Sequence, residues 1–251
     1  MTDIVYSVAS GTTAQMQRLE ILSNNLANAS TAGFKADHPV FGTYLPMEES
    51  DAGEAPPDDT LQLPGSTHVK IGATRTDFSS GLLRRTGNAL DAALVGPGFF
   101  VVQTDGGEQY TRDGQFRLDE SGRLVSSDGQ PVMGDGGEIR LAGDQVTIVV
   151  SGGIWIDGAQ VARLKTVVFD TPEKLQKMGR TRFSAPPEVT PRSPENPVGV
   201  KQGYLEQSNV DTIRTMTEMI DTLRAYESYQ KAMRSADDST AKVINEVGQP
   251  V

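Results

Sequence analysis

Five Asp-Gly pairs, together with Ser121-Gly122, are the residues of this 251-residue chain whose types first suggest chemistry, because aspartate next to glycine is typical of calcium-binding loops. Such a loop needs acidic or amide ligands at its first, third and fifth positions and a glutamate at its twelfth. None of the six sequences supplies that pattern. Because they mostly recur every seven or eight residues, they predict tight turns between short antiparallel strands. The Asp-Gly pairs begin at Asp105, Asp113, Asp128, Asp135 and Asp157.

A second candidate is Gly96-Pro97-Gly98, which begins like a dinucleotide-binding fingerprint. Val101 stands where the third glycine of that fingerprint belongs. The segment also leads into a predicted strand, so a phosphate would not meet a helix N-terminus there. The sequence contains no nucleotide P-loop, no metalloprotease zinc motif and no Gly-x-Ser-x-Gly elbow. We therefore expect no nucleotide cofactor.

Paired carboxylates are the remaining catalytic candidates, since 33 acidic residues offer many pairs that could hydrolyse a glycosidic bond. Nothing in the sequence singles out one pair. Zero cysteines exclude a disulfide scaffold, a thiolate nucleophile and a Cys-ligated metal, and His38 and His68 are the only histidines. We expect no catalytic residue, no cofactor and no metal site. A periplasmic enzyme that cleaves carbohydrate or peptidoglycan stays open as a second hypothesis.

The charge of the chain excludes other classes of function. It carries 23 basic and 33 acidic residues, a net charge of −10, which argues against nucleic-acid binding. No apolar stretch approaches the ~20 residues of a membrane helix, so we expect no direct membrane insertion. The N-terminus lacks the basic and then apolar pattern of a cleaved secretory signal.

The elements that would position any site begin with the stretch from Thr2 to Asn28. Its apolar residues recur every three or four positions, which predicts a helix with a seam suited to coiled-coil contact. The period is lost between Asn28 and Gly33, where the helix should end. The seam comprises Val5, Val8, Leu19, Leu22 and Leu26, with Thr12 and Gln15 in the same frame.

The last stretch, from about Asn209 to Val247, predicts a second helix, which Asn209 or Asp211 could cap. Its seam is as narrow as the first. At 1.5 Å per residue the two helices would be roughly 40 Å and about 58 Å long. The seam begins with Ile213, Met216, Ile220, Leu223 and Tyr226.

Between the helices, β-branched and alternating runs predict one all-β domain. An acidic segment, Met47 to Asp59, precedes it, and a proline-rich segment, Ala185 to Pro197, follows it. The predicted fold class is mixed, with segregated α and β parts: long N- and C-terminal helices that form a coiled-coil region, and a central all-β domain. The expected segments are the N-terminal helix at 1–30, an extended linker at 31–68, the β domain at 69–186, a return linker at 187–204 and the C-terminal helix at 205–251.

Three ordered motifs resemble the signatures of the bacterial flagellar rod and hook proteins. The resemblance covers the whole chain. The chain length and the sequence of Met1 to Phe41 are more similar to the proximal rod components than to the distal ones, which remain the alternative. Ala89, Ala92 and Pro97 depart mildly from the family pattern. The motifs are Asn24 to Lys35, Thr86 to Val102 with Tyr110 to Phe116, and Gly203 to Val210 with Met219-Ile220 and Arg224 to Glu227.

This resemblance implies a structural subunit of the flagellar basal-body rod, which polymerises helically with copies of itself and with other rod proteins into the periplasm-spanning drive shaft for motility. It implies export through the flagellar type III apparatus, a location in the periplasmic rod of the basal body, and no enzyme activity. A chain without cysteine suits an oxidising periplasm, since it cannot cross-link there. A monomeric adaptor that holds one partner by its helices is a third hypothesis.

Two sets of residues follow as candidate sites of the rod interpretation. The seams are expected to form the assembly interface through Val5, Val8, Leu19, Leu22, Leu26, Ile213, Met216, Ile220, Leu223 and Tyr226. The end of the N-terminal motif is expected to shape the joint between the inner helix and the outer domains through Asn24, Asn25, Asn28, Gly33 and Phe34.

Overall fold

The computed structural model of the chain describes residues 2–44, 68–143, 145–194 and 198–247. The acidic segment Met47 to Asp59 lies outside these residues. The chain divides into two compact units. The first unit comprises Met1–Leu26, Asp37–Arg75 and Thr212–Val251, and the second comprises Ala27–Ala36 and Thr76–Asp211.

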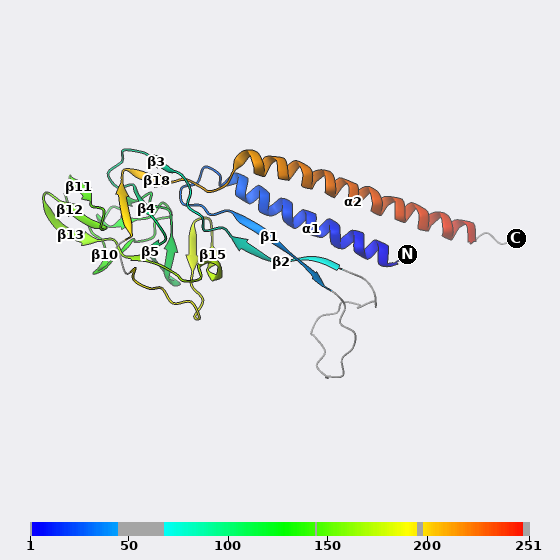
Figure 1. The fold of residues 1–251 in the computed structure, drawn as a ribbon, viewed down its shortest axis with the longest axis horizontal. Helices are drawn as coiled ribbons and strands as arrows, with labels where there is room; N and C mark the ends of the chain where they lie inside the picture. The colour runs from blue at the N-terminus through cyan, green and yellow to red at the C-terminus, as the bar shows by residue number, and fades with distance from the viewer. Residues whose placement is uncertain (1, 45–67, 144, 195–197, 248–251) are drawn as a thin grey trace, which may run out of the picture. The chain divides into compact units, whose positions relative to one another are not determined.

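The first unit contains the two α-helices and a pair of strands. α1 spans Thr2–Ala27 and α2 spans Thr212–Val247, so both predicted helical stretches are helices (Figure 1). β1 (Asp37–Tyr44) pairs with β2 (His68–Thr76). The helices meet where Gly11 of α1 faces the ring of Tyr229, because a Cβ atom at Gly11 would lie 2.9 Å from Tyr229 Cε1.

The prediction that the two terminal helices form a coiled-coil region is wrong. In the described part of the chain strands predominate, and no long coiled-coil pair of helices is evident. Among the α2 side chains that the structure describes, Thr215 and Thr222 are buried, whereas the seam predicted there is largely exposed. The physical reason is that a period of 3.5 residues shows which residues share one side of a helix, but not which side of the helix is packed. The exposed fractions are 80% for Ile213, 47% for Met216, 51% for Ile220 and 42% for Leu223.

The second unit is built from short strands whose described pairings are antiparallel. Its largest sheet has the order β14-β5-β6-β16-β15, and a second sheet has the order β11-β12-β13. The elements are β3 (Leu83–Arg85), β4 (Ala92–Val95), β5 (Phe99–Thr104), β6 (Gly107–Thr111), β7 (Arg117–Leu118), β8 (Leu124–Val125), β9 (Met133–Gly134), β10 (Gly137–Glu138), β11 (Val146–Ile148), β12 (Gly153–Ile156), β13 (Ala159–Arg163), β14 (Thr166–Val167), the 3-10 helix Pro172–Lys174, β15 (Gln176–Met178), β16 (Arg182–Ser184), β17 (Gly199–Gln202) and β18 (Tyr204–Glu206).

Several of the Asp-Gly pairs form the turns that the sequence predicts. Asp105-Gly106 connects β5 to β6, Asp135-Gly136 connects β9 to β10, and Asp157-Gly158 connects β12 to β13. Asp157 and Gly158 both adopt positive φ angles, of 50° and 84°, as a two-residue hairpin turn requires.

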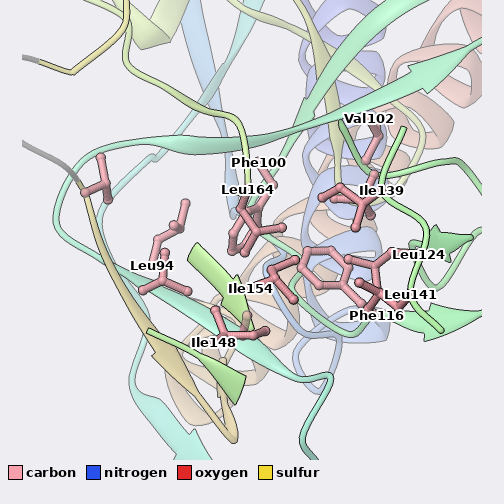
Figure 2. Close-up of a cluster of buried hydrophobic side chains, with 14 of the residues drawn as sticks. Leu94, Phe100, Val102, Phe116, Leu124, Ile139, Leu141, Ile148, Ile154 and Leu164 are labelled. Atoms are coloured by element: carbon pink, nitrogen blue, oxygen red, sulfur yellow. The ribbon is translucent and has the colours of Figure 1, made fainter. Parts of the chain in front are cut away.

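Strand β5 separates two hydrophobic clusters. Side chains of a strand point alternately to opposite faces, so Phe100 and Val102 enter one cluster whereas Phe99 and Val101 enter the other. In the first cluster the rings of Phe100 and Phe116 meet edge to face at 5.0 Å. Figure 2 shows this cluster, with Phe116 beside Leu124 and Leu141. The continuous apolar run of β5 therefore reflects burial on both faces.

Strands β17 and β18 return past the proline-rich segment and complete the second unit. β17 pairs with β4, with Val200 opposite Leu94, and β18 pairs with β3, with Leu205 opposite Arg84. Val200 is buried in the first cluster. The stretch that composition predicts as a return linker, 187–204, thus contributes strand β17 and the buried residues Val189, Val198 and Val200 to this unit.

Candidate functional site: a buried junction of the three motifs

The N-terminal motif ends in a tight turn at Gly33. Its φ angle is 67°, in the left-handed region that favours glycine. Its N–H donates to the Glu206 carbonyl at 2.8 Å. A Cβ atom at Gly33 would lie 2.2 Å from the backbone nitrogen of Asp113. Gly33 therefore allows the N-terminal, central and C-terminal motifs to touch at one point.

Lys35 and Glu206 form the centre of this junction. Both side chains are buried, and Lys35 Nζ lies 2.7 Å from Glu206 Oε1. Lys35 Nζ also donates to the Ser79 carbonyl at 2.6 Å, and the Gly81 N–H donates to Glu206 Oε1 at 2.9 Å. One carboxylate from the C-terminal motif therefore holds the N-terminal motif and the segment around Ser79 together.

Arg112 of the central motif adds a second cation. Its Nη1 lies 3.3 Å from Glu206 Oε2, and its Nη2 donates to the Gly96 carbonyl at 2.8 Å. Its guanidinium carbon lies 5.5 Å from the centre of the Phe99 ring. Arg112 Nε is buried and has no hydrogen-bond partner among the residues that the structure describes. The junction thus contains two cations for one carboxylate.

Burial dominates the electrostatics of these groups. Desolvation lowers the pKa of Lys35, and the nearby Glu206 carboxylate offsets part of that effect. Desolvation also lowers the pKa of Arg112, again partly offset by Glu206. Removing Glu206 would leave both buried cations without an ion-pair partner among the described residues, which is strongly unfavourable.

Asp113 extends the junction on the side of the central motif. Its Oδ2 accepts a hydrogen bond from Ser127 Oγ at 2.5 Å, and its Oδ1 accepts one from the Gln115 N–H at 3.0 Å. Burial nevertheless raises the pKa of Asp113 above its ordinary value, and Asp128 and Asp91 act in the same direction. Asp113-Gly114 is therefore a buried structural pair, unlike the Asp-Gly pairs in the hairpin turns.

Phe34 and Asn209 make further contacts next to the junction. Phe34 is fully buried, and Lys177 Nζ lies 3.9 Å from the centre of its ring. Asn209 Oδ1 accepts from the Ala36 N–H at 2.8 Å, while its Nδ2 donates to the Asp77 carbonyl at 2.9 Å. These contacts fix the segments that follow Lys35 and precede Ser79.

The asparagines predicted at the joint have different environments. Asn25 is buried, and its amide exchanges two hydrogen bonds with the backbone of Asp37, at 2.8 and 2.9 Å. Asn28 accepts hydrogen bonds from the N–H and the hydroxyl of Thr31, at 3.1 and 3.2 Å, in the turn after α1. Asn24 is exposed. The structure therefore places Gly33 and Phe34 in the junction, Asn25 against Asp37, and Asn28 in the turn.

The residues predicted for the assembly interface differ in their burial within the single chain. Leu22 is buried, and the Val5 side chain lies outside the described part of the structure. On α2, the exposed members are Ile213, Met216, Ile220 and Leu223. The half-buried members are Val8, Leu19, Leu26 and Tyr226.

Sequence reasoning missed Lys35, Arg112 and Glu206 as a set. All three lie inside the three family motifs, but charged side chains are rarely buried, and only the tertiary fold reveals that they pair. Among the described residues, no group of three or more His, Cys, Asp or Glu side chains could hold a metal ion. No helix of the described part is long and apolar enough to cross a membrane.

Comparisons with known proteins match the same three regions. Residues 6–35 match the family described as flagella basal body rod protein, and residues 93–156 match the flagellar hook protein FlgE/F/G D1 domain. Residues 201–246 match the flagellar basal body rod FlgEFG protein C-terminal region. Lys35, Arg112 and Glu206 each fall in a different one of these matches. The flagellar basal-body rod protein FlgF of Rhizobium meliloti (strain 1021) is 32% identical over 247 residues, which cover 97% of each chain.

The chain belongs to the flagellar basal-body rod protein family. This rod protein is also 35% identical to FlgF of Caulobacter vibrioides (strain ATCC 19089 / CIP 103742 / CB 15), over 93% of each chain. It is 34% identical to the rod protein FlgG of Buchnera aphidicola subsp. Schizaphis graminum (strain Sg), over 93% of this chain and 95% of the relative. The family predicted from the motifs is confirmed. The protein is a structural component of the rod in the flagellar basal body.

Proposed function

We propose that the rod protein is a FlgF-type subunit that assembles helically with copies of itself and with other rod proteins. Two FlgF relatives align with it over nearly their full length, which supports a rod subunit of this type. Heterologous contacts between identical subunits generate an open helical assembly when their rotation does not close. The subunit would reach the rod through the flagellar type III export apparatus, and its role would be mechanical, without catalysis.

The observation that carries the assembly proposal is the exposed apolar stripe on α2, formed by Ile213, Met216, Ile220 and Leu223. These side chains recur at intervals of three and four residues, so they lie along one side of the helix. All four are exposed, whereas Thr215 and Thr222 of the same helix are buried. A contiguous exposed apolar surface on a soluble subunit marks an interaction site. The α2 stripe is the surface that we assign to neighbouring subunits.

The test uses a motile strain that carries the native gene. That gene is replaced by genes that encode variants of the α2 stripe. The double variant Ile220→Asp with Leu223→Asp should be absent from purified basal bodies and should abolish swimming, because unpaired charges would be buried at the contact. The matched control Ser228→Asp adds a negative charge at an exposed position off the stripe and should swim normally. Because the stripe is exposed, the purified double variant should have the same midpoint denaturant concentration for unfolding as the wild-type protein. Normal swimming and incorporation of the double variant would contradict the proposal.

The distal FlgG-type subunit is the second candidate, and the 34% identity to a FlgG of similar length supports it. Complementation separates the two candidates. Expression of this chain should restore swimming to a strain that lacks its FlgF and leave a strain that lacks its FlgG non-motile. The reverse pattern would assign the chain to the FlgG type.

A further inference from the structure

The segment from Val198 to Asn209, here called the strap, touches more of the second unit than its length suggests. Its first half supplies Val198 and Val200 to the first hydrophobic cluster, and β17 pairs with β4. Its second half pairs with β3 and delivers the Glu206 carboxylate to the junction. Asn209 then bonds the backbones of Ala36 and Asp77.

The N-terminal motif cannot be buried favourably until the strap is in place. Lys35 Nζ has the Glu206 carboxylate as its only ion-pair partner among the described residues. The same carboxylate is the only one paired with Arg112 there. Burying either cation without a counter-charge would carry the full desolvation penalty. The backbone N–H of Gly33 also depends on the strap, since it donates to the Glu206 carbonyl.

The strap makes the longest-range connections of the second unit. Lys35 and Glu206 are 171 residues apart, and Ala36 and Asn209 are 173 apart. The other strands include local hairpins such as β5–β6, β12–β13 and β15–β16, which close over a few residues. Loop closure becomes less favourable as the separation grows, so local hairpins form before distant pairings.

We propose that the strap is a closing element: the sheets around β5 form first, and docking of the strap then buries Gly33, Phe34 and Lys35 in one step. A chain whose C-terminal region is held away from the rest would therefore stay open at its N-terminal motif. This inference concerns folding of the single subunit and does not depend on the rod contacts proposed above.

Because the chain contains no cysteine, single cysteines can report when each part becomes protected. Val132→Cys places a thiol in the first cluster outside the strap, and Val200→Cys places one in the strap. Both positions are buried, and the substitution changes the volume little. Each full-length variant is unfolded in denaturant, diluted to refold, and pulsed with a thiol reagent after increasing delays. The thiol at 132 should become protected at least tenfold faster than the thiol at 200. Equal rates, or earlier protection at 200, would overturn the proposal.

A second measurement on the folded full-length chain tests the role of the Glu206 carboxylate. In a Glu206→Gln background, the thiol at 200 should react at least tenfold faster than in the parent, while the thiol at 132 changes much less. The matched control is Glu108→Gln, which removes a partly exposed pair with Lys165 and should leave both thiols unchanged. If Glu206→Gln accelerates both thiols equally, the strap does not open as a separate element and the proposal fails.

Discussion

Glu206 Oε1 lies 2.7 Å from Lys35 Nζ, and neither side chain is open to solvent. The two residues belong to opposite ends of the chain, yet their pairing, with Arg112 as a third member, joins all three regions that match the rod family. A buried ion pair adds little net stability compared with an apolar pair, but breaking it by removing one partner is strongly destabilising. The junction therefore acts mainly as a specific registration point between distant segments.

Glu206→Gln is expected to lower the free energy of unfolding by about 3–5 kcal/mol, because Lys35 and Arg112 would keep their burial and lose their counter-charge. Urea denaturation of the purified chain measures this difference. Glu108→Gln, at a partly exposed pair with Lys165, should change the free energy by about 1 kcal/mol or less. Equal losses for the two variants would show that burial of the Glu206 pair has no energetic consequence.

Gly33→Ala should be much more destabilising than Gly87→Ala. Both glycines have positive φ angles, of 67° and 77°, so each alanine incurs about 1–2 kcal/mol of backbone strain. A Cβ atom at Gly33 would also overlap the Asp113 backbone, whereas nothing lies within 4 Å of one at Gly87. The overlap should add about 1–3 kcal/mol to the loss at Gly33. Thermal unfolding of both variants tests this, and equal shifts in Tm would refute the close approach.

The sequence predicts the local elements of this molecule better than its long-range contacts. The period of three to four residues predicts helices at both ends, and α1 and α2 lie there. The Asp-Gly pairs predict hairpin turns, because a short polar side chain and glycine tolerate the required φ angles. Local backbone chemistry decides both features, and it can be read from neighbouring residues.

The features that depend on tertiary contact could not be read in this way. The period does not say which side of α2 is packed, so the buried Thr215 and Thr222 were not predicted. Proline density near 187–197 suggested a linker, although β17 follows directly and enters the core. Lysine and glutamate usually lie at the protein surface, and only the pairing of Lys35 with Glu206 explains their burial.

Asp113 and Asp119 should affect the pH dependence of stability with opposite signs. Burial raises the pKa of Asp113 above 3.8, so unfolding releases a proton at pH values between 3.8 and its folded pKa. Stability therefore falls as pH rises through that window, and Asp113→Asn should remove this fall. The backbone N–H of Arg123 is the main cause that lowers the pKa of Asp119 well below 3.8.

Asp119 stabilises the folded chain above pH 3.8, and that contribution is lost as the pH falls toward the pKa of Asp119 in the folded state. Asp119→Asn should therefore flatten the acid limb of the stability curve. Thermal unfolding of the parent protein and the two variants, Asp113→Asn and Asp119→Asn, from about pH 2 to about pH 7 measures both effects. If the two variants changed the curve with the same sign, the assigned environments of the carboxyls would be wrong.

The central claim, that neighbouring rod subunits cover the α2 stripe, is tested most directly by a thiol at Ile213, the most exposed apolar side chain of that stripe. Ile213→Cys introduces the only cysteine of the chain, and Ser228→Cys serves as the control off the stripe. In the isolated protein both thiols should react readily with a maleimide. In purified basal bodies the thiol at 213 should react at least about tenfold more slowly, a ratio that corresponds to about 1.4 kcal/mol of protection. Equal reactivity of that thiol in the isolated protein and in basal bodies would contradict the account.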